Sequence, residues 1–114
     1  PDSAHQIAVD GDYGYIADGQ SGLQIIDISD RRKPSFVAEL DLEDIVGNIV
    51  VKGKYAYLGG SEKFHIVDIA DPGNPYVVKT HDGMNGAIGG LDVRGNLAYL
   101  GGNSLQIVKI CDLP

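Results

Sequence analysis

The sequence lacks tryptophan, contains one cysteine and has no long apolar run. A single cysteine forms neither an internal disulfide nor a cysteine-rich zinc site, so Cys111 leaves the redox compartment open. No segment reaches the roughly 18 to 20 apolar residues that a membrane-spanning helix requires. The opening Pro1-Asp2-Ser3 does not resemble a secretion signal, although the absence of a leader from this sequence does not exclude secretion.

Positive charge is also sparse. The chain has 9 Lys and Arg against 16 Asp and Glu, which gives a formal net charge of −7 at pH 7. The only basic cluster is DRRK at residues 30–33, where we expect a solvated turn. Because neutralising phosphates requires clustered Lys and Arg, we expect no nucleic-acid partner.

Glycine, in contrast, is abundant. The 114 residues include 16 Gly and 5 Pro, and 43% of them are hydrophobic. Scattered Gly and Pro are typical of short strands joined by turns, and the regular apolar residues argue against disorder. We expect a single domain over residues 1–114, long enough to bury a sizeable core.

Three segments of the chain are similar to one another. The phrase LQIIDISD begins at Leu23, and its counterparts FHIVDIAD and LQIVKICD begin at Phe64 and Leu105. The phrases recur every 41 residues, whereas the segments upstream of them recur every 42. A one-residue slip is harmless in a loop but inverts every side chain of a strand, so the slip marks a loop. The repeats span approximately residues 7–48, 49–90 and 91–114.

Each complete repeat predicts four short strands, with Gly, Asp, Asn and Pro at the turns between them. The predicted strands are 6–10, 13–18, 23–29, 36–42, 48–52, 55–59, 64–70, 76–80, 91–94, 97–101 and 105–111. The only helical alternative is the short segment LDLEDIV at residues 40–46.

The third strand of each repeat carries apolar residues on both faces. In the first repeat, Leu23 and Ile25 lie on one face, and Ile26 and Ile28 lie on the other. An antiparallel sheet with one solvated face would instead alternate apolar and polar residues. Four-stranded sheets that are covered on both faces and repeat every 40 to 45 residues are typical of β-propellers. We therefore expect an all-β fold of four-stranded antiparallel blades.

The segments GDYGYIADGQSGLQIIDISDRRKP and GKYAYLGGSEKFHIVDIADPGNP resemble the LVIVD repeat. The resemblance covers nearly the whole chain as two full copies and one partial copy. It implies β-propeller blades, often of bacterial or archaeal surface or secreted proteins, and it supplies no shared catalytic residues. Two features depart from the family pattern: Lys109 replaces an acidic residue, and DRRKP replaces the usual DP turn.

The chain encodes about two and three-quarter blades, whereas closed propellers typically have four to eight. Such an arc leaves one flank of the first blade and one of the third uncovered, and large uncovered apolar surfaces are normally interfaces. Two alternatives stay open. The chain is a segment of a longer propeller, or copies of it assemble around a common axis, with roughly eight blades from three copies.

The histidines give little support for catalysis. His65 and Asp68 are three residues apart in a predicted strand, which places them on opposite faces. His65 also occupies the position of Gln24 and Gln106 in the other repeats, as expected of a structural polar residue. His81 is the most accessible histidine by its place at a strand end, and we expect it to be solvated. We predict no catalytic residue.

The acidic residues recur in phase with the repeat. Asp27 matches Asp68, and Asp30 matches Asp71, so we expect each to accept backbone N–H bonds at a turn. The close carboxylates at residues 10–12 and 41–44 lack the distant Glu of a calcium loop. The glycine-rich segment 82–90 lacks the Lys and Ser or Thr of a phosphate loop. We predict no metal and no cofactor.

Binding is expected where the loops between blades meet those between second and third strands, an analogy that rests on the fold alone. The candidate residues are Glu43, Asp44, Asn48, His81, Met84 and Asn85, and we expect all of them except His81 to be exposed on these loops. An acidic rim suits a basic protein surface or a polar glycan. We expect a non-catalytic binding or scaffold module of a cell-surface or secreted protein. The alternatives are a fragment of a larger propeller enzyme, with its catalytic residues in missing blades, or an array without a ligand.

Overall fold

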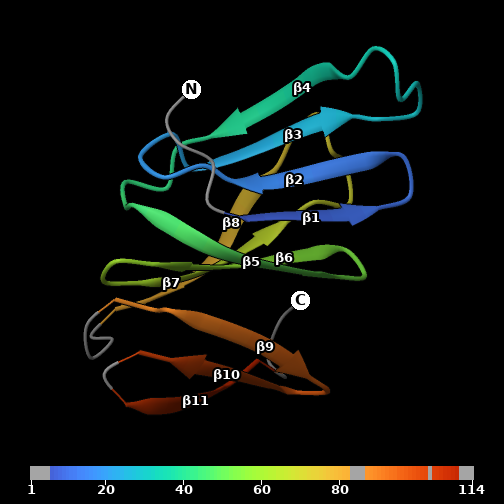
Figure 1. The fold of residues 1–114 in the computed structure, drawn as a ribbon. Helices are drawn as coiled ribbons and strands as arrows, with labels where there is room; N and C mark the ends of the chain where they lie inside the picture. The colour runs from blue at the N-terminus through green and yellow to red at the C-terminus, as the bar shows by residue number, and fades with distance from the viewer. Residues whose placement is uncertain (1–5, 83–86, 103, 111–114) are drawn as a thin grey trace.

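The computed structural model describes residues 6–82, 87–102 and 104–110. Within these ranges the chain forms eleven β-strands and no helix. The strands make three antiparallel sheets, and in each sheet every strand pairs with the strand next to it in sequence. The sheets follow one another along the molecule, which measures 41 × 29 × 19 Å (Figure 1). The part of the chain described here contains no helix suited to crossing a lipid bilayer.

We refer to the sheets by their order in the sequence. Sheet 1 contains β1 (Gln6–Asp10), β2 (Tyr13–Ala17), β3 (Leu23–Asp27) and β4 (Ser35–Leu40). Sheet 2 contains β5 (Val46–Lys52), β6 (Tyr55–Gly60), β7 (Phe64–Asp68) and β8 (Tyr76–His81). Sheet 3 contains β9 (Gly90–Arg94), β10 (Leu97–Gly101) and β11 (Leu105–Lys109).

The strand predictions are confirmed, and the differences lie at strand ends. The largest changes are of two residues: the third and fourth strands of the first repeat and the third strands of the others end two residues early, and β5 begins two residues early, at Val46. The helical alternative over residues 40–46 is wrong, because Leu40 ends β4 and Val46 begins β5. That segment contains Asp41 and Asp44, whose side chains bond to backbone N–H groups and stabilise a linker instead of a helix.

The first hairpin of each sheet has the same two-residue turn. Asp10 pairs with Tyr13 across a turn that begins at Gly11. Gly11, Gly53 and Gly95 have φ angles of 61°, 60° and 56°, a region that L-residues other than Asn and Asp seldom adopt. Glycine at this position therefore fixes the register of each first hairpin.

Two apolar layers hold the three sheets together. Strands β1 and β2 pack against β5, and β5 and β6 pack against β9. The layer between sheets 1 and 2 includes Leu23, Ile25, Val46, Ile49, Leu58 and Val67. The layer between sheets 2 and 3 includes Tyr57, Phe64, Ile66, Val93, Ala98 and Leu100. Every residue of β7 is buried, as predicted for a strand covered on both faces.

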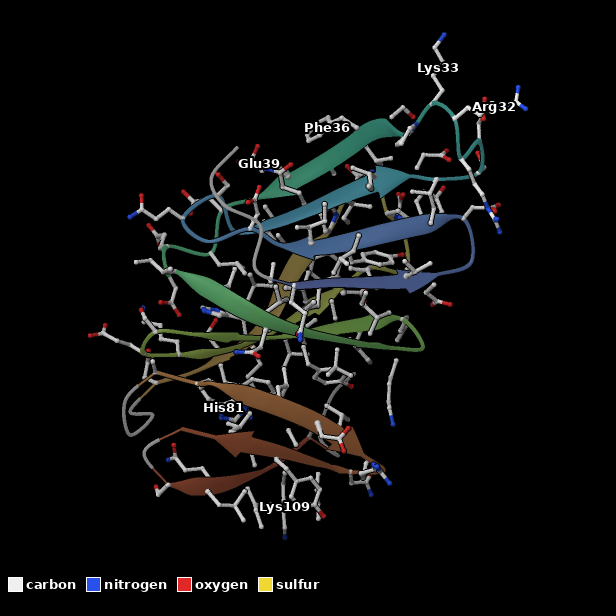
Figure 2. All side chains as sticks on the ribbon, viewed as in Figure 1. Arg32, Lys33, Phe36, Glu39, His81 and Lys109 are labelled. Atoms are coloured by element: carbon white, nitrogen blue, oxygen red, sulfur yellow. The ribbon has the colours of Figure 1, made fainter. Side chains whose placement is uncertain are left out.

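Sheets 1 and 3 each leave one face open. On sheet 1 the open face carries Ile7, Val9 and Phe36, which are 54%, 64% and 63% exposed. On sheet 3 it carries Leu105 and Ile107, which are 67% and 55% exposed. Figure 2 shows Phe36 on the outer strand β4 at one end of the molecule and Lys109 on β11 at the other. The predicted uncovered flanks are thus present, and burial on both faces holds for sheet 2 alone.

Candidate functional site

The described binding candidates, Glu43, Asp44, Asn48 and His81, lie where strands end and the linkers between neighbouring sheets run. Here the β2–β3 loop bonds to the start of β5: Gly19 N donates to Val46 O at 3.0 Å, and Val46 N donates to Gly19 O at 3.1 Å. These two bonds fix the linker between β4 and β5 against sheet 1. We call the side of the molecule that carries the β2–β3 and β6–β7 loops and the β4–β5 linker the rim.

Asp44 anchors the same linker to sheet 2. Its Oδ2 lies 2.9 Å from His65 Nε2 on β7. Its Oδ1 accepts hydrogen bonds from Ser61 Oγ at 2.7 Å, Ser61 N at 3.2 Å and Ile45 N at 2.8 Å. The Asp44 and His65 side chains are only 3% and 2% exposed. The pair is therefore enclosed and fully engaged with the protein.

Two opposing effects act on the Asp44 carboxyl. Burial, the larger single effect, raises its pKa, because desolvation disfavours the charged form. The hydrogen bonds from His65, Ser61 and Ile45 together outweigh that effect and lower the pKa below the ordinary aspartate value. Asp44 is consequently ionised at neutral pH and remains so in mild acid.

Gly60 makes room for this carboxylate. A Cβ atom on Gly60 would overlap Asp44 Oδ2, so no other residue fits there without displacing Asp44. The corresponding residue of sheet 1 is Asp18, whose Oδ2 accepts a 2.8 Å hydrogen bond from Gln24 Nε2. Gln24 in turn corresponds to His65. Both sheets therefore place a carboxylate beside the polar residue of the third strand, from different positions in the chain.

The two carboxylates differ in how well they are satisfied. Asp18 is 2% exposed, and its Oδ1 has no hydrogen-bond partner among the described residues. Asp44 uses both oxygens and has four donors or charge partners. The Asp44 cluster is thus a stabilising contact, whereas Asp18 carries an unmatched acceptor.

The exposed acidic groups of the rim lie around this buried pair. Glu43 is exposed with a φ of 53°, and its N donates to Asp41 Oδ1 at 2.8 Å. Asp82 lies 3.9 Å from Lys63 Nζ, a weak surface pair. We define the acidic rim as the exposed residues Asp41, Glu43, Glu62 and Asp82.

The predicted binding residues differ in their exposure and in their contacts. Glu43 is exposed on the rim as expected. Asp44 was expected to be exposed and is not, because His65 and Ser61 draw its side chain inward. Asn48 is half-buried and donates from Nδ2 to Ile88 O at 2.7 Å, which links β5 to the segment that leads into β9. Met84 and Asn85 lie outside the described residues.

His81 is half-buried and belongs to the packing between sheets 2 and 3. Its ring stacks on Phe64 with centroids 5.7 Å apart and an interplanar angle of 25°. Its Nε2 is buried without a hydrogen-bond partner among the described residues. Burial, followed by the charge of Lys79, lowers its pKa, so the ring is neutral at pH 7. The solvated role expected of His81 is therefore incorrect.

The LVIVD repeat matches residues 1–41, 45–82 and 85–113, which is most of the chain. The chain belongs to the LVIVD repeat family. The matched segments coincide with sheets 1, 2 and 3 in turn. No curated protein matches the sequence.

Solved structures show the same fold in two computationally designed proteins. The Ika8 protein aligns over 94% of this LVIVD chain with a TM-score of 0.77 and 12% identity. The Ika4 protein aligns over 94% with a TM-score of 0.76 and 12% identity. The LVIVD chain spans 33% of the Ika8 chain and 66% of the Ika4 chain. At this identity the likeness concerns the fold alone.

The in-phase aspartates of the LVIVD repeats stabilise turns, as predicted. Asp27 Oδ1 accepts from Ser29 N at 2.8 Å, and Asp68 Oδ1 accepts from Ala70 N at 2.9 Å. Asp30 and Asp71 do the same in the following turn, accepting from residues 32 and 73 at 3.0 and 3.1 Å. Within the described ranges, no cluster of three or more His, Cys, Asp and Glu side chains could hold a metal ion.

Sequence reasoning missed the Asp44–His65 pair. The two residues are 21 positions apart, and their contact depends on how the linker folds back over sheet 2. One signal was present in the LVIVD repeats. Gly60 replaces Asp18 in the same repeat where His65 replaces Gln24, which indicates a carboxylate supplied from elsewhere.

Proposed function

We propose that this chain is part of a β-propeller, with each sheet as one blade, and that it acts as a non-catalytic binding module. Three observations support the architecture: the LVIVD repeats, the sequential antiparallel sheets and the fold shared with Ika8 and Ika4. In a propeller, blades pack face to face around an axis, as sheets 1, 2 and 3 pack through two apolar layers.

The distribution of carboxylates carries the proposal of binding. Acidic residues that recur in phase are engaged in turns, whereas Glu43 and Glu62 of the acidic rim are exposed and do not recur. Loops on a rigid scaffold commonly carry binding residues. The His65–Asp44 pair would be a candidate acid–base pair in an open cleft, but at 2% and 3% exposure it is closed to a substrate. The burial of the pair favours a structural role.

The charge of the acidic rim favours a partner with a basic protein surface. Opposite charge across an interface steers encounter and selects partners. With a net charge of −7, the chain as a whole adds to this attraction. We place the module at the cell surface or outside the cell, in keeping with the LVIVD resemblance. Protease shaving of intact source cells tests that location, because an intracellular chain would stay uncleaved.

The test compares two double charge reversals in arrays of lysine- and arginine-rich peptides and of polar glycans. Glu43→Lys with Glu62→Lys alters the acidic rim, and Asp10→Lys with Asp12→Lys makes the same change of charge at the opposite end of the strands. For basic peptides bound by the wild type, we expect the rim variant to weaken binding about tenfold or more in a salt-dependent manner. The control should change binding less than about threefold.

Equal weakening by both variants would assign the binding to overall charge and reject the rim as a site. Binding of glycans alone, without salt dependence, would replace the basic protein partner by a carbohydrate. No binding to either array, with the chain folded by circular dichroism, would contradict the proposed function.

A further inference from the structure

We propose that the turn between β3 and β4 of sheet 1 binds a short acidic segment of a partner protein through Arg31, Arg32 and Lys33. We call these three residues the basic turn. The proposal concerns a surface other than the acidic rim and is independent of the function proposed for that rim. It rests on three observations: the cations are exposed and unpaired, the turn does not need them, and nearby carboxylates limit what else can bind.

The side chains of the basic turn have no charge partner in the part of the chain that the structure describes. All three residues are exposed, and none of them forms an ion pair with a described residue. Figure 2 shows Arg32 and Lys33 extending outward from the turn. The chain has 9 Lys and Arg in all, so a third of its positive charge lies in three consecutive residues.

The turn keeps its shape without these charges, because sheet 2 builds the same turn from uncharged residues. The sequence DRRKP of sheet 1 stands where sheet 2 has DPGNP. In sheet 1, Arg32 N donates to Asp30 Oδ1 and Lys33 N donates to Asp30 O, each at 3.0 Å. In sheet 2, residues 73 and 74 make the same two bonds to Asp71, at 3.1 and 2.9 Å. Backbone bonds therefore hold the turn, and the three cations are available to a ligand.

The exposure of the basic turn does not depend on where sheet 1 lies in the stack. Sheet 2 has a neighbouring sheet on each of its faces, and Asp71, Gly73 and Asn74 of its corresponding turn are exposed nevertheless. Such a turn lies beyond the ends of the strands and outside the apolar layers. The basic turn would therefore stay accessible with a further sheet packed on sheet 1.

The chemistry of the basic turn selects a closely spaced pair or triplet of oxyanions. Guanidinium groups bind carboxylates and phosphates through paired N–H donors. Three consecutive residues span at most about 10 Å, and successive residues of an extended peptide are about 3.3 Å apart. A segment with two or three neighbouring Asp, Glu or phosphorylated residues therefore presents its charges at the spacing of the three cations.

Acidic residues at the same end of sheet 1 restrict the partner to a short one. The exposed residues Asp10 and Asp12 belong to the β1–β2 turn, which lies at the same end of the strands as the basic turn. Two strand spacings separate these turns, roughly 10 Å, which is close to one Debye length at physiological salt. A flat anionic membrane or a long polyanion would also meet these carboxylates and the net charge of −7. A short acidic segment contacts the basic turn alone.

The experiment titrates the full chain with a labelled hexaglutamate peptide and with a labelled peptide that carries adjacent phosphoserines, followed by fluorescence anisotropy. The turn variant, Arg31→Pro/Arg32→Gly/Lys33→Asn, copies the turn of sheet 2 and should therefore fold like the wild type. We expect it to bind about tenfold more weakly, because three charge-assisted contacts are lost. Binding to the wild type should fall steeply between about 0.05 and 0.5 M salt.

A matched control separates the site from overall charge. Lys52→Gln/Lys54→Gln/Arg94→Gln removes three other exposed cations beside the first turns of sheets 2 and 3. It changes the net charge by the same amount as the turn variant, and it should change binding less than about threefold.

A transplant tests whether the three cations are sufficient. Pro72→Arg/Gly73→Arg/Asn74→Lys moves the basic sequence to the corresponding turn of sheet 2. A Cβ on Gly73 would have its nearest contact at 3.5 Å, an ordinary distance, so an arginine fits there. Added to the turn variant, the transplant should bring binding back to within about threefold of the wild type.

Binding of one peptide but not the other would support the proposal and identify the oxyanion as carboxylate or phosphate. Equal weakening by the turn variant and the control would assign binding to overall charge and overturn the proposal. A folded transplant that restores nothing would show that the three cations do not make the site. No binding of either peptide at low salt, with the wild type folded by circular dichroism, would reject the site itself. Binding only to heparin or to phosphatidylcholine vesicles that contain phosphatidylserine would replace the acidic segment by a polysaccharide or a membrane.

Discussion

Asp44 and His65 meet at 2.9 Å across 21 residues of sequence, and the carboxylate occupies the space that a side chain on Gly60 would need. In sheet 1 the carboxylate comes instead from Asp18, at the position of Gly60. The carboxylate that contacts the polar residue of the third strand thus comes from a linker residue in sheet 2 and from a residue at the end of β2 in sheet 1. This exchange ties the linker between the two sheets to the second of them.

Asp44→Asn should destabilise the protein more than Asp18→Asn. The first change removes a buried charge that has four partners, at a cost of about 2 to 3 kcal/mol in the free energy of unfolding. The second change converts an unmatched acceptor into an amide and should cost less than about 1 kcal/mol. Urea denaturation of the two variants measures the difference, and equal losses would refute the assigned roles.

The carboxylate should be transferable between the two positions. Gly60→Asp alone should cost about 3 kcal/mol or more, because the new side chain overlaps Asp44. Combining it with Asp44→Gly should recover more than half of that loss by recreating the arrangement of Asp18. A double-mutant cycle of unfolding free energies provides the measurement. Additive losses would mean that Gly60 and Asp44 do not share one space.

His81 should make the protein less stable in mild acid. Its pKa is lowered in the folded state by burial and by Lys79, so the unfolded chain binds the proton more tightly. Its contribution to stability is therefore complete above about pH 6.5 and is lost as the pH falls through the folded-state pKa.

The variant that tests this is His81→Leu, since Leu40 occupies the same position in sheet 1. We expect the substitution to stabilise the protein more at pH 5 than at pH 8, because Leu removes the proton uptake that favours the unfolded chain in acid. Thermal unfolding at several pH values measures it. The same gain at both pH values would instead indicate better packing without a titration effect.

Two glycines with positive φ should respond very differently to alanine. Gly11 has a φ of 61° and open space where a Cβ would lie, so Gly11→Ala should cost about 1 kcal/mol. Gly22 has a φ of 75°, and a Cβ there would overlap Leu40 O, so Gly22→Ala should cost about 3 kcal/mol or more. Chemical denaturation of both variants checks the order, and a reversed order would refute the steric argument.

The sequence predicted the strands because each turn carries its own local chemistry. Gly11 and its counterparts fix the hairpins, and Asp27 and Asp68 stabilise the turns after the third strands. Both are local interactions that recur with the repeat.

The placement of Asp44 did not follow from local chemistry. Its side-chain partners, His65 and Ser61, belong to or follow strands of sheet 2, and its carboxylate lies where Gly60 has no side chain. His65 was correctly placed on the face opposite Asp68, but its partner could not be found from strand alternation alone. His81 was misplaced for a similar reason, because its stacking on Phe64 depends on pairing between β7 and β8.

The complete burial of β7 has a consequence for how the molecule comes apart. Arrays in which each unit contacts only its neighbours lose structure from their ends. The backbone amides of β7 should therefore exchange with solvent only on global unfolding, while those of β1 and β11 exchange through local fraying. The stability of the whole chain therefore depends most on sheet 2. Cleavage of the backbone within β7 should unfold sheets 1 and 3 together with it.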